Sequence, residues 1–219
     1  MAVRVVPTLA AMAEVYRRPL DERFDAYVDL ARTGAPVASY NPMTSQDVLG
    51  TIERLLAIDA EALVAESLAD VETDLALAIV VAAPGMWTDR LATEVEHRLA
   101  GKGRNEVLLW VGEDTGADAV RAAALADFVR ATRPVPRTVA EAVEQEGDAL
   151  ALAGMTGTYD DHAAEVLDVL GADTTLSSMV AFLYGDDAAA ALGFTPVGLG
   201  PRVGERHAVA LAHRYRQRA

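Results

Sequence analysis

The chain has 219 residues, which is enough for one ordinary domain or for one domain with a helical extension. Its 19 lysines and arginines against 33 aspartates and glutamates give a net charge of −14, which argues against a nucleic-acid-binding protein, because such a protein needs a basic surface. The sequence contains no cysteine, so disulfides, thiolate metal sites and a cysteine nucleophile are excluded.

Residues 1–72 are predicted to be helical. Apolar residues at intervals of three and four predict two short helices within 8–32, separated at Pro19. A further helix is predicted to begin at Thr44, where the third residue that follows is acidic and completes a capping-box pattern. The last helix of this segment is predicted over 59–71. The sequence therefore predicts an all-helical N-terminal segment.

Residues 73–133 are predicted to form a β-α-β-α unit. The continuous apolar runs 75–81 and 107–111 are typical of strands that are buried on both faces. A helix is predicted to follow each strand, the first from Thr88 and the second ending near Thr132. This order implies two parallel strands joined by a right-handed crossover. Because two strands make only a small sheet, we expect a third strand from elsewhere in the chain or from a partner chain.

Residues 134–219 are predicted to be mostly helical. The helices are expected at 138–153, 158–170, 186–192 and from Gly204 onwards. The apolar residues of 176–184 fit a helix and a strand equally well. Pro134 and Pro136 mark a plausible boundary, but we expect a single compact domain over residues 1–219.

Together, these elements predict a helix-rich α/β fold, with a small and mainly parallel sheet covered by helices. The chain is rich in alanine, which favours helices, and only 5% of its residues are aromatic, fewer than a β-sandwich normally uses. No apolar run reaches the roughly 18–20 residues that cross a bilayer. The first residues do not read as an export signal, so we expect a soluble, cytoplasmic protein without a membrane partner.

The segments that follow the two predicted strands carry the first candidate site. The carboxyl ends of parallel strands meet at one edge of a sheet, where open α/β sheets bind ligands. The helix predicted to begin at Thr88 offers free N–H groups to an anion. Two further candidates lie in the glycine-rich stretch 198–207, where arginines beside a helix start can bind a phosphate or a carboxylate. The candidate ligand-binding residues are Trp87, Thr88, Asp89, Arg90, Glu113, Asp114, Thr115, Arg202 and Arg206.

These residues also have a purely structural interpretation. Thr88 and Asp114 are residue types that cap helices, Trp87 is a typical core residue, and the acidic residues between them are typical of solvated surface. Neither strand is followed by a phosphate-binding glycine motif, so the sequence does not predict a nucleotide site. We expect no cofactor.

Two pairs of residues have the spacing of metal ligands on a helix. Glu94 and His97 lie three residues apart, as do His162 and Glu165, and this spacing places both members of a pair on one helix face. A di-metal carboxylate site needs a second Glu-x-x-His motif, which the chain lacks, so no metal site is predicted. No serine lies in a Gly-x-Ser-x-Gly motif, and no catalytic residue is predicted.

The segment 188–198, with the sequence AAAALGFTPVG, resembles the late helix-to-strand segment of acetyl-coenzyme A-dependent N-acetyltransferases, often written A-x-x-L-G-F. The resemblance covers 11 residues. The pyrophosphate-binding Arg/Gln-x-x-Gly-x-Gly/Ala motif of that family is absent from this sequence. The resemblance implies acetyl transfer as a remote alternative function.

Two classes of function follow from these patterns. In the first, the protein binds a small anionic metabolite at the strand-end edge, with no reaction specified. In the second, it is a non-catalytic structural or interaction protein that acts as a homodimer, because its alanine-rich helices can pack closely against a second copy. Residues 201–219 contain five arginines and one glutamate, a net charge of +4, and this stretch can dock on an acidic surface of the protein or of a partner.

Overall fold

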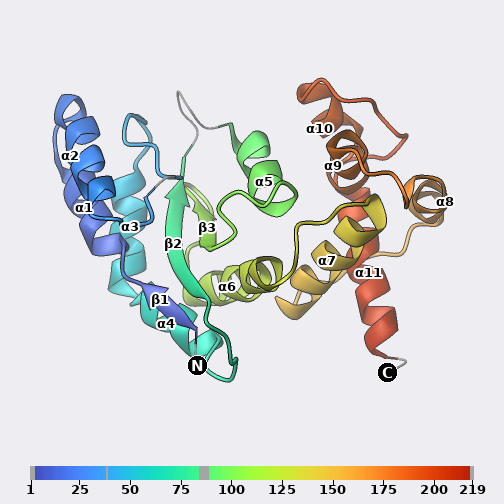
Figure 1. Cartoon of the computed structure of the whole chain (residues 1–219), viewed down its shortest axis with the longest axis horizontal. Coiled ribbons are helices and arrows are strands. Elements are labelled where there is room, and N and C mark those ends of the chain that lie inside the picture. Colours follow the sequence, from blue (N-terminus) through green and yellow to red (C-terminus); the bar gives the residue numbers. More distant parts are fainter. Residues whose placement is uncertain (1–2, 38, 84–88, 218–219) are drawn as a thin grey trace. The chain divides into compact units, whose positions relative to one another are not determined.

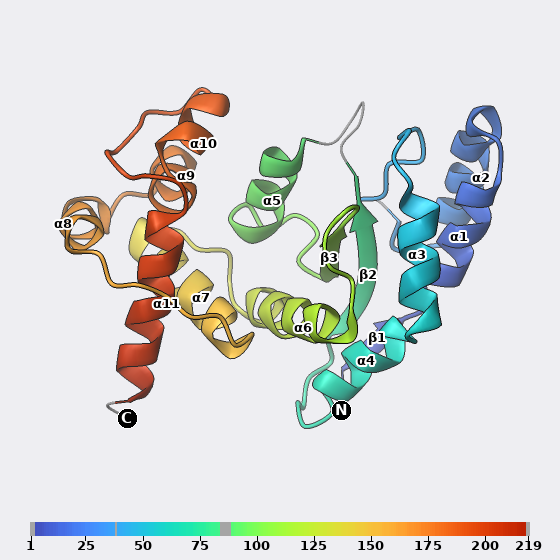
Figure 2. The same ribbon diagram turned by 180° about the vertical axis from the view of Figure 1, so that it is seen from behind.

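The computed structural model describes residues 3–37, 39–83 and 89–217 (Figure 1; reverse view in Figure 2). The chain divides into two compact units. Unit 1 contains residues 1–90 and 105–128, and unit 2 contains residues 91–104 and 129–219. Each unit therefore combines segments that are far apart in the sequence. The fold is a helix-rich α/β fold with a small parallel sheet, as predicted. Across the described ranges, no helix is both long and apolar enough to cross a bilayer.

Unit 1 contains the sheet. Its described strands are β1 (Arg4–Val6), β2 (Ala76–Ala82) and β3 (Glu106–Trp110), all parallel and in the order β1-β2-β3. Val6 pairs with Ala78, and Ala82 pairs with Trp110, so β2 is the central strand. Six of the seven residues of β2 are buried. This burial on both faces explains why the strand is a continuous apolar run instead of an alternating one.

The third strand comes from residues 4–6, so the prediction of helices alone in residues 1–72 needs correction. β1 is three residues long and stops before Pro7, which has no N–H to donate. A segment of three residues is too short to show the alternation of apolar and polar residues that predicts a strand. β1 is a strand because it pairs with the chain beside it: the Arg4 N–H donates a hydrogen bond to the Leu75 carbonyl at 3.0 Å, just ahead of β2.

Unit 1 also contains helices. They are α1 (Leu9–Arg17), α2 (Leu20–Arg32), α3 (Val48–Ala57), α4 (Ala60–Ser67) and most of α6 (Ala117–Thr132). α3 packs against β2, and α1 packs against α3 (Figures 1 and 2). The predicted start of α3 at Thr44 is wrong. Asp47 is the N-cap, because its carboxylate accepts a hydrogen bond from the Gly50 N–H at 2.9 Å.

Unit 2 is helical in the part of it that the structure describes. Its helices are α5 (Arg90–Arg98, from its second residue), the end of α6, α7 (Val139–Leu152), α8 (Asp161–Leu170), α9 (Leu176–Tyr184), α10 (Asp186–Ala191) and α11 (Val203–Arg216). The ambiguous segment 176–184 is the helix α9. Its last six residues are all buried, so no polar face revealed its period in the sequence. Thr138 caps α7, as predicted, by accepting a hydrogen bond from the Glu141 N–H at 3.2 Å.

Helices α7 and α11 approach closely at a glycine. A Cβ atom on Gly147 of α7 would lie 2.4 Å from the Ala208 carbonyl oxygen of α11. A similar approach occurs at Gly204 of α11, where a Cβ atom would lie 2.0 Å from the Phe182 carbonyl oxygen of α9. The absence of a side chain at these two positions allows α11 to lie against both neighbours.

Candidate functional site

Arg90 and Glu113 meet at the carboxyl-terminal edge of the sheet in unit 1. Arg90 is the first residue of α5, which follows β2, and Glu113 follows β3. The Arg90 guanidinium donates a hydrogen bond to the Glu113 carboxylate. Its Cζ atom lies 5.2 Å from the ring centroid of Trp110, the last residue of β3, which is a cation–π distance. The side chains of Arg90 and Glu113 remain 47% and 46% exposed.

The other candidates at this edge have different surroundings. Trp87 and Thr88 lie outside the described residues, and Asp89 is exposed. Asp114 accepts a hydrogen bond from the Gly116 N–H at 2.8 Å, so it organises the turn ahead of α6. Thr115 is buried. Of this group, the structure brings Arg90 and Glu113 into direct contact.

Helix N-termini follow each strand, and acidic side chains lie at or directly before them. At the start of α1, after β1, Glu61 of α4 accepts hydrogen bonds from the Thr8 and Leu9 N–H groups at 2.7 and 3.0 Å. α6, after β3, has Asp118 in its first turn. α5, after β2, has no acidic residue in its first turn and begins with a cation, Arg90, which directly follows Asp89. A helix N-terminus favours negative charge, so an arginine is unusual there.

Arg202 and Arg206 belong to unit 2, and Arg202 is already bound by carboxylates. Its guanidinium donates to Glu94 at 2.9 Å and to Glu205 at 2.6 Å, and its Cζ atom lies 5.2 Å from the Tyr184 ring centroid. Arg206 is exposed and donates to the Pro201 carbonyl at 3.1 Å. The sequence predicts both as anion ligands, but Arg202 lies in an internal ion network.

That network contains buried charges that the sequence did not predict. Glu146 of α7 is 4% exposed and accepts two hydrogen bonds, at 3.0 and 2.7 Å, from Nε and Nη2 of Arg130, which is 6% exposed. Glu94 of α5 is equally buried, at 2%. Burial raises the pKa of Glu146, but Arg130 and Arg98 lower it by more, so this pKa lies below its ordinary value. The pair is therefore ionised at neutral pH.

Arg98 lies between the two buried carboxylates without a hydrogen bond to either. Its Nη1 atom is 3.7 Å from Glu94 and 3.6 Å from Glu146, and this buried donor has no hydrogen-bond partner. Beside it, burial raises the pKa of Tyr184 to about 12. One sequence signal points to this cluster: Glu94 and Arg98 each stand one residue before the apolar stripe of α5, at Val95 and Leu99, and so lie at the border of its buried face.

The two residue pairs with metal-ligand spacing make other contacts in the structure. His97 Nδ1 lies 3.1 Å from the Thr93 carbonyl, and Glu94 is in the ion network. His162 and Glu165 are 3.7 Å apart on α8, with side chains 59% and 80% exposed. Within the described ranges, no three histidine, aspartate or glutamate side chains gather as a metal site would require.

Comparisons with known proteins identify no relative of this chain. No protein-family model matches the chain, and neither the curated proteins nor the solved structures contain a match. The segment that resembles N-acetyltransferases departs from the helix-to-strand pattern. α10 ends at Ala191, and residues 192–202 form turns and irregular chain.

Proposed function

We propose that this protein binds a small anionic molecule at the carboxyl-terminal edge of the sheet in unit 1. One observation carries the proposal: Arg90, from the segment after β2, contacts both Glu113 and Trp110, from the end of β3. Charged and aromatic side chains from the ends of neighbouring parallel strands thus converge at the edge where open α/β sheets bind ligands.

The chemistry of the site favours an anion with two or more oxygen atoms. The planar guanidinium presents its donors as a fork that matches carboxylate and phosphate groups. The ring of Trp110 orients this fork, and about half of the side chain is open to solvent. The proposal specifies binding and no reaction.

Isothermal titration calorimetry with inorganic phosphate, pyrophosphate and citrate tests this proposal. We expect at least one of them to bind, and Arg90→Ala to weaken that binding about tenfold or more, because a charge-assisted hydrogen bond contributes about 1.5–3 kcal/mol. Arg90→Lys keeps the charge but loses the fork, and should fall between the two. The matched control is Arg32→Ala, which removes an exposed arginine of unit 1 that pairs with Asp29, three residues earlier in α2. If no anion binds, or if Arg90→Ala binds as well as the control, the proposal is wrong.

A further inference from the structure

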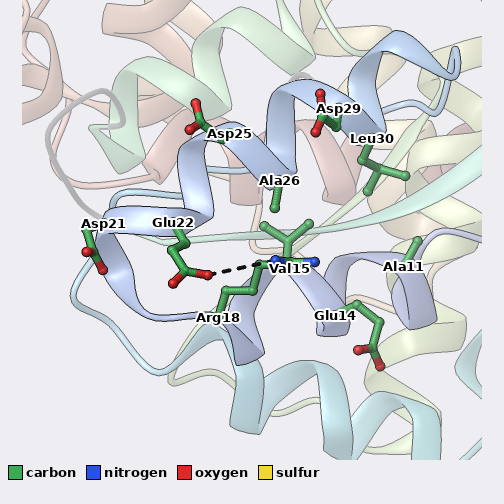
Figure 3. Close-up of a pocket in the computed structure, with 10 residues that line it drawn as sticks. All are labelled: Ala11, Glu14, Val15, Arg18, Asp21, Glu22, Asp25, Ala26, Asp29 and Leu30. Atoms are coloured by element: carbon green, nitrogen blue, oxygen red, sulfur yellow. Dashed lines mark ion pairs between the residues drawn. The ribbon is translucent and has the colours of Figure 1, made fainter.

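A groove of about 590 Å³ separates α1 and α2 on the surface of unit 1 (Figure 3). Its floor is apolar: Val15 and Ala26 point toward each other between the two helices, with Ala11 and Leu30 beside them. The groove is distant in sequence from the segments that form the strand-end edge. It therefore needs its own explanation.

Helix α2 is poorly covered by the rest of unit 1. None of its 13 residues is buried, although the helix is amphipathic. Leu20 and Phe24 are 46% and 45% exposed. A helix normally gains most of its stability in a protein by burying its apolar face, so α2 has apolar surface left for a further contact.

The margin of the groove is strongly acidic. It carries the five carboxylates Glu14, Asp21, Glu22, Asp25 and Asp29 and the single cation Arg18, a net charge of −4. Arg18 lies 3.8 Å from Glu22, whereas the carboxylates of Asp21 and Asp25 have no ion pair or hydrogen bond within the described chain. An occupant that matches this groove combines positive charge with an apolar or aromatic group.

The chain itself contains a segment with that chemistry. Residues 206–219 include four arginines and no acidic residue. In the last turn of α11, Tyr215 is 69% exposed and stands between two arginines. The Cζ atom of Arg214 lies 3.8 Å from the Tyr159 ring centroid, and Arg216 donates to the Asp148 carbonyl at 3.3 Å. We propose that the last turn of α11 of one copy docks in the α1/α2 groove of a second copy, with Tyr215 on the apolar floor and its two arginines against Asp21 and Asp25.

This contact joins two different surfaces, so each copy offers one groove and one α11 end. Such a head-to-tail contact builds open chains or closed rings instead of a two-fold dimer. One aromatic anchor and a few charges bury much less than the roughly 1,200 Å² of a stable interface, so the association should be weak and reversible. It should also weaken as salt rises, because its charges are exposed.

Sedimentation velocity over a series of protein concentrations, at low and high salt, tests the contact. We expect mass to rise with concentration at low salt and to fall back at high salt. Asp21→Lys/Asp25→Lys and Arg214→Glu/Arg216→Glu should each abolish association. An equimolar mixture of the two variants should restore it, because the natural groove of one variant meets the natural helix end of the other, and the two reversed surfaces also have opposite charges. The mixture also guards against a misfolded variant, which could not be rescued.

The matched control is Asp70→Lys/Asp118→Lys, which makes the same charge change at two exposed aspartates of unit 1 outside the groove. It should associate at least as well as the natural chain. The proposal is overturned if the natural chain stays monomeric at every concentration, if the control abolishes association as completely as the groove variant does, or if the mixture of reversed variants does not associate.

Discussion

At the scale of single residues, the buried ion pair between Arg130 and Glu146 gives a sharp prediction. Glu146→Ala leaves the guanidinium of Arg130 inside unit 2 without its bidentate partner. Breaking a buried pair in this way typically costs about 3–5 kcal/mol, because an uncompensated charge remains. We expect urea denaturation to show a loss of that size in the free energy of unfolding.

A surface pair is the control for this variant. Glu14→Ala removes one of two partners of Arg17, which also pairs with Glu53; these side chains are largely exposed, and the loss should be no more than about 1 kcal/mol. Arg130→Met together with Glu146→Leu should recover much of the loss, because an apolar pair carries no unpaired charge. Equal effects of Glu146→Ala and Glu14→Ala would show that the pair is not buried in solution.

His207 predicts a dependence of stability on pH. This residue of α11 is 1% exposed, and its Nδ1 accepts a hydrogen bond from the N–H of Asp160, the residue that caps α8. Burial lowers the pKa of His207, and Arg214 lowers it further. Asp160 and Asp161 raise this pKa, but by less, so the pKa of His207 lies below its ordinary value. The imidazole of His207 therefore binds a proton more readily in the unfolded chain than in the folded chain. The contribution of neutral His207 to stability is present above the ordinary pKa and is lost as pH falls through the folded pKa.

Urea denaturation between about pH 5 and pH 8 measures this effect. His207→Gln cannot titrate, so the variant should be less stable than the natural chain at the upper end and should show a smaller slope toward acid. His162→Gln, at an exposed histidine of α8, is the matched control substitution. A His207→Gln slope as steep as that of the natural chain would contradict the role given to this hydrogen bond.

At the scale of elements, the crossing of α7 and α11 depends on Gly147. In an isolated helix, Gly→Ala stabilises by about 1 kcal/mol. Here the added Cβ atom would lie 2.4 Å from the Ala208 backbone oxygen, so the helices must separate. We expect Gly147→Ala to destabilise the protein by about 1–3 kcal/mol, as overpacking does, measured by thermal unfolding. Gly200→Ala, where the nearest atom is 3.6 Å away on a side chain, should be close to neutral. A stabilised Gly147→Ala variant would rule out this close approach.

Most elements were predictable because their signals are local. The apolar runs of β2 and β3 and the capping box at Thr138 depend on residues only a few positions apart. β1 and α9 were not, because the first is defined by its pairing with β2 and the second is buried on all sides at its end. Contacts across the fold decide such elements, and a single sequence does not show them.

The candidate sites divide in the same way. The meeting of Arg90 and Glu113 follows from parallel topology, because strand ends share an edge. The ion network could not be predicted in this way, because Arg202 and Glu94 are 108 residues apart. In the sequence, Glu94 looks like any acidic residue on an exposed helix face. Only the packing of α5 within unit 2 shows that this carboxylate is buried.

At the scale of the whole molecule, the two units do not follow the order of the chain. Pro134 and Pro136 mark a plausible boundary in the sequence, but unit 2 also takes in residues 91–104. These residues supply Val95 and Leu99 of α5 to a core that includes Val143 and Phe182. They also supply Glu94 and Arg98 to the ion network.

A fragment of residues 134–219 should therefore fold poorly, because it lacks α5 and Arg130, so that a core cavity and the unpaired charge of Glu146 remain. A chain that joins 91–104 to 129–219 through a short glycine–serine linker contains all of unit 2. The linker is feasible because the Arg104 side chain donates to the Arg130 carbonyl at 2.8 Å, which places the two ends close together. We expect cooperative urea unfolding by circular dichroism and dispersed amide NMR signals from the linked chain alone. If the fragment 134–219 unfolds as cooperatively as the linked chain and at the same urea concentration, α5 is not part of the folding unit, and the loss of Arg130 costs little stability.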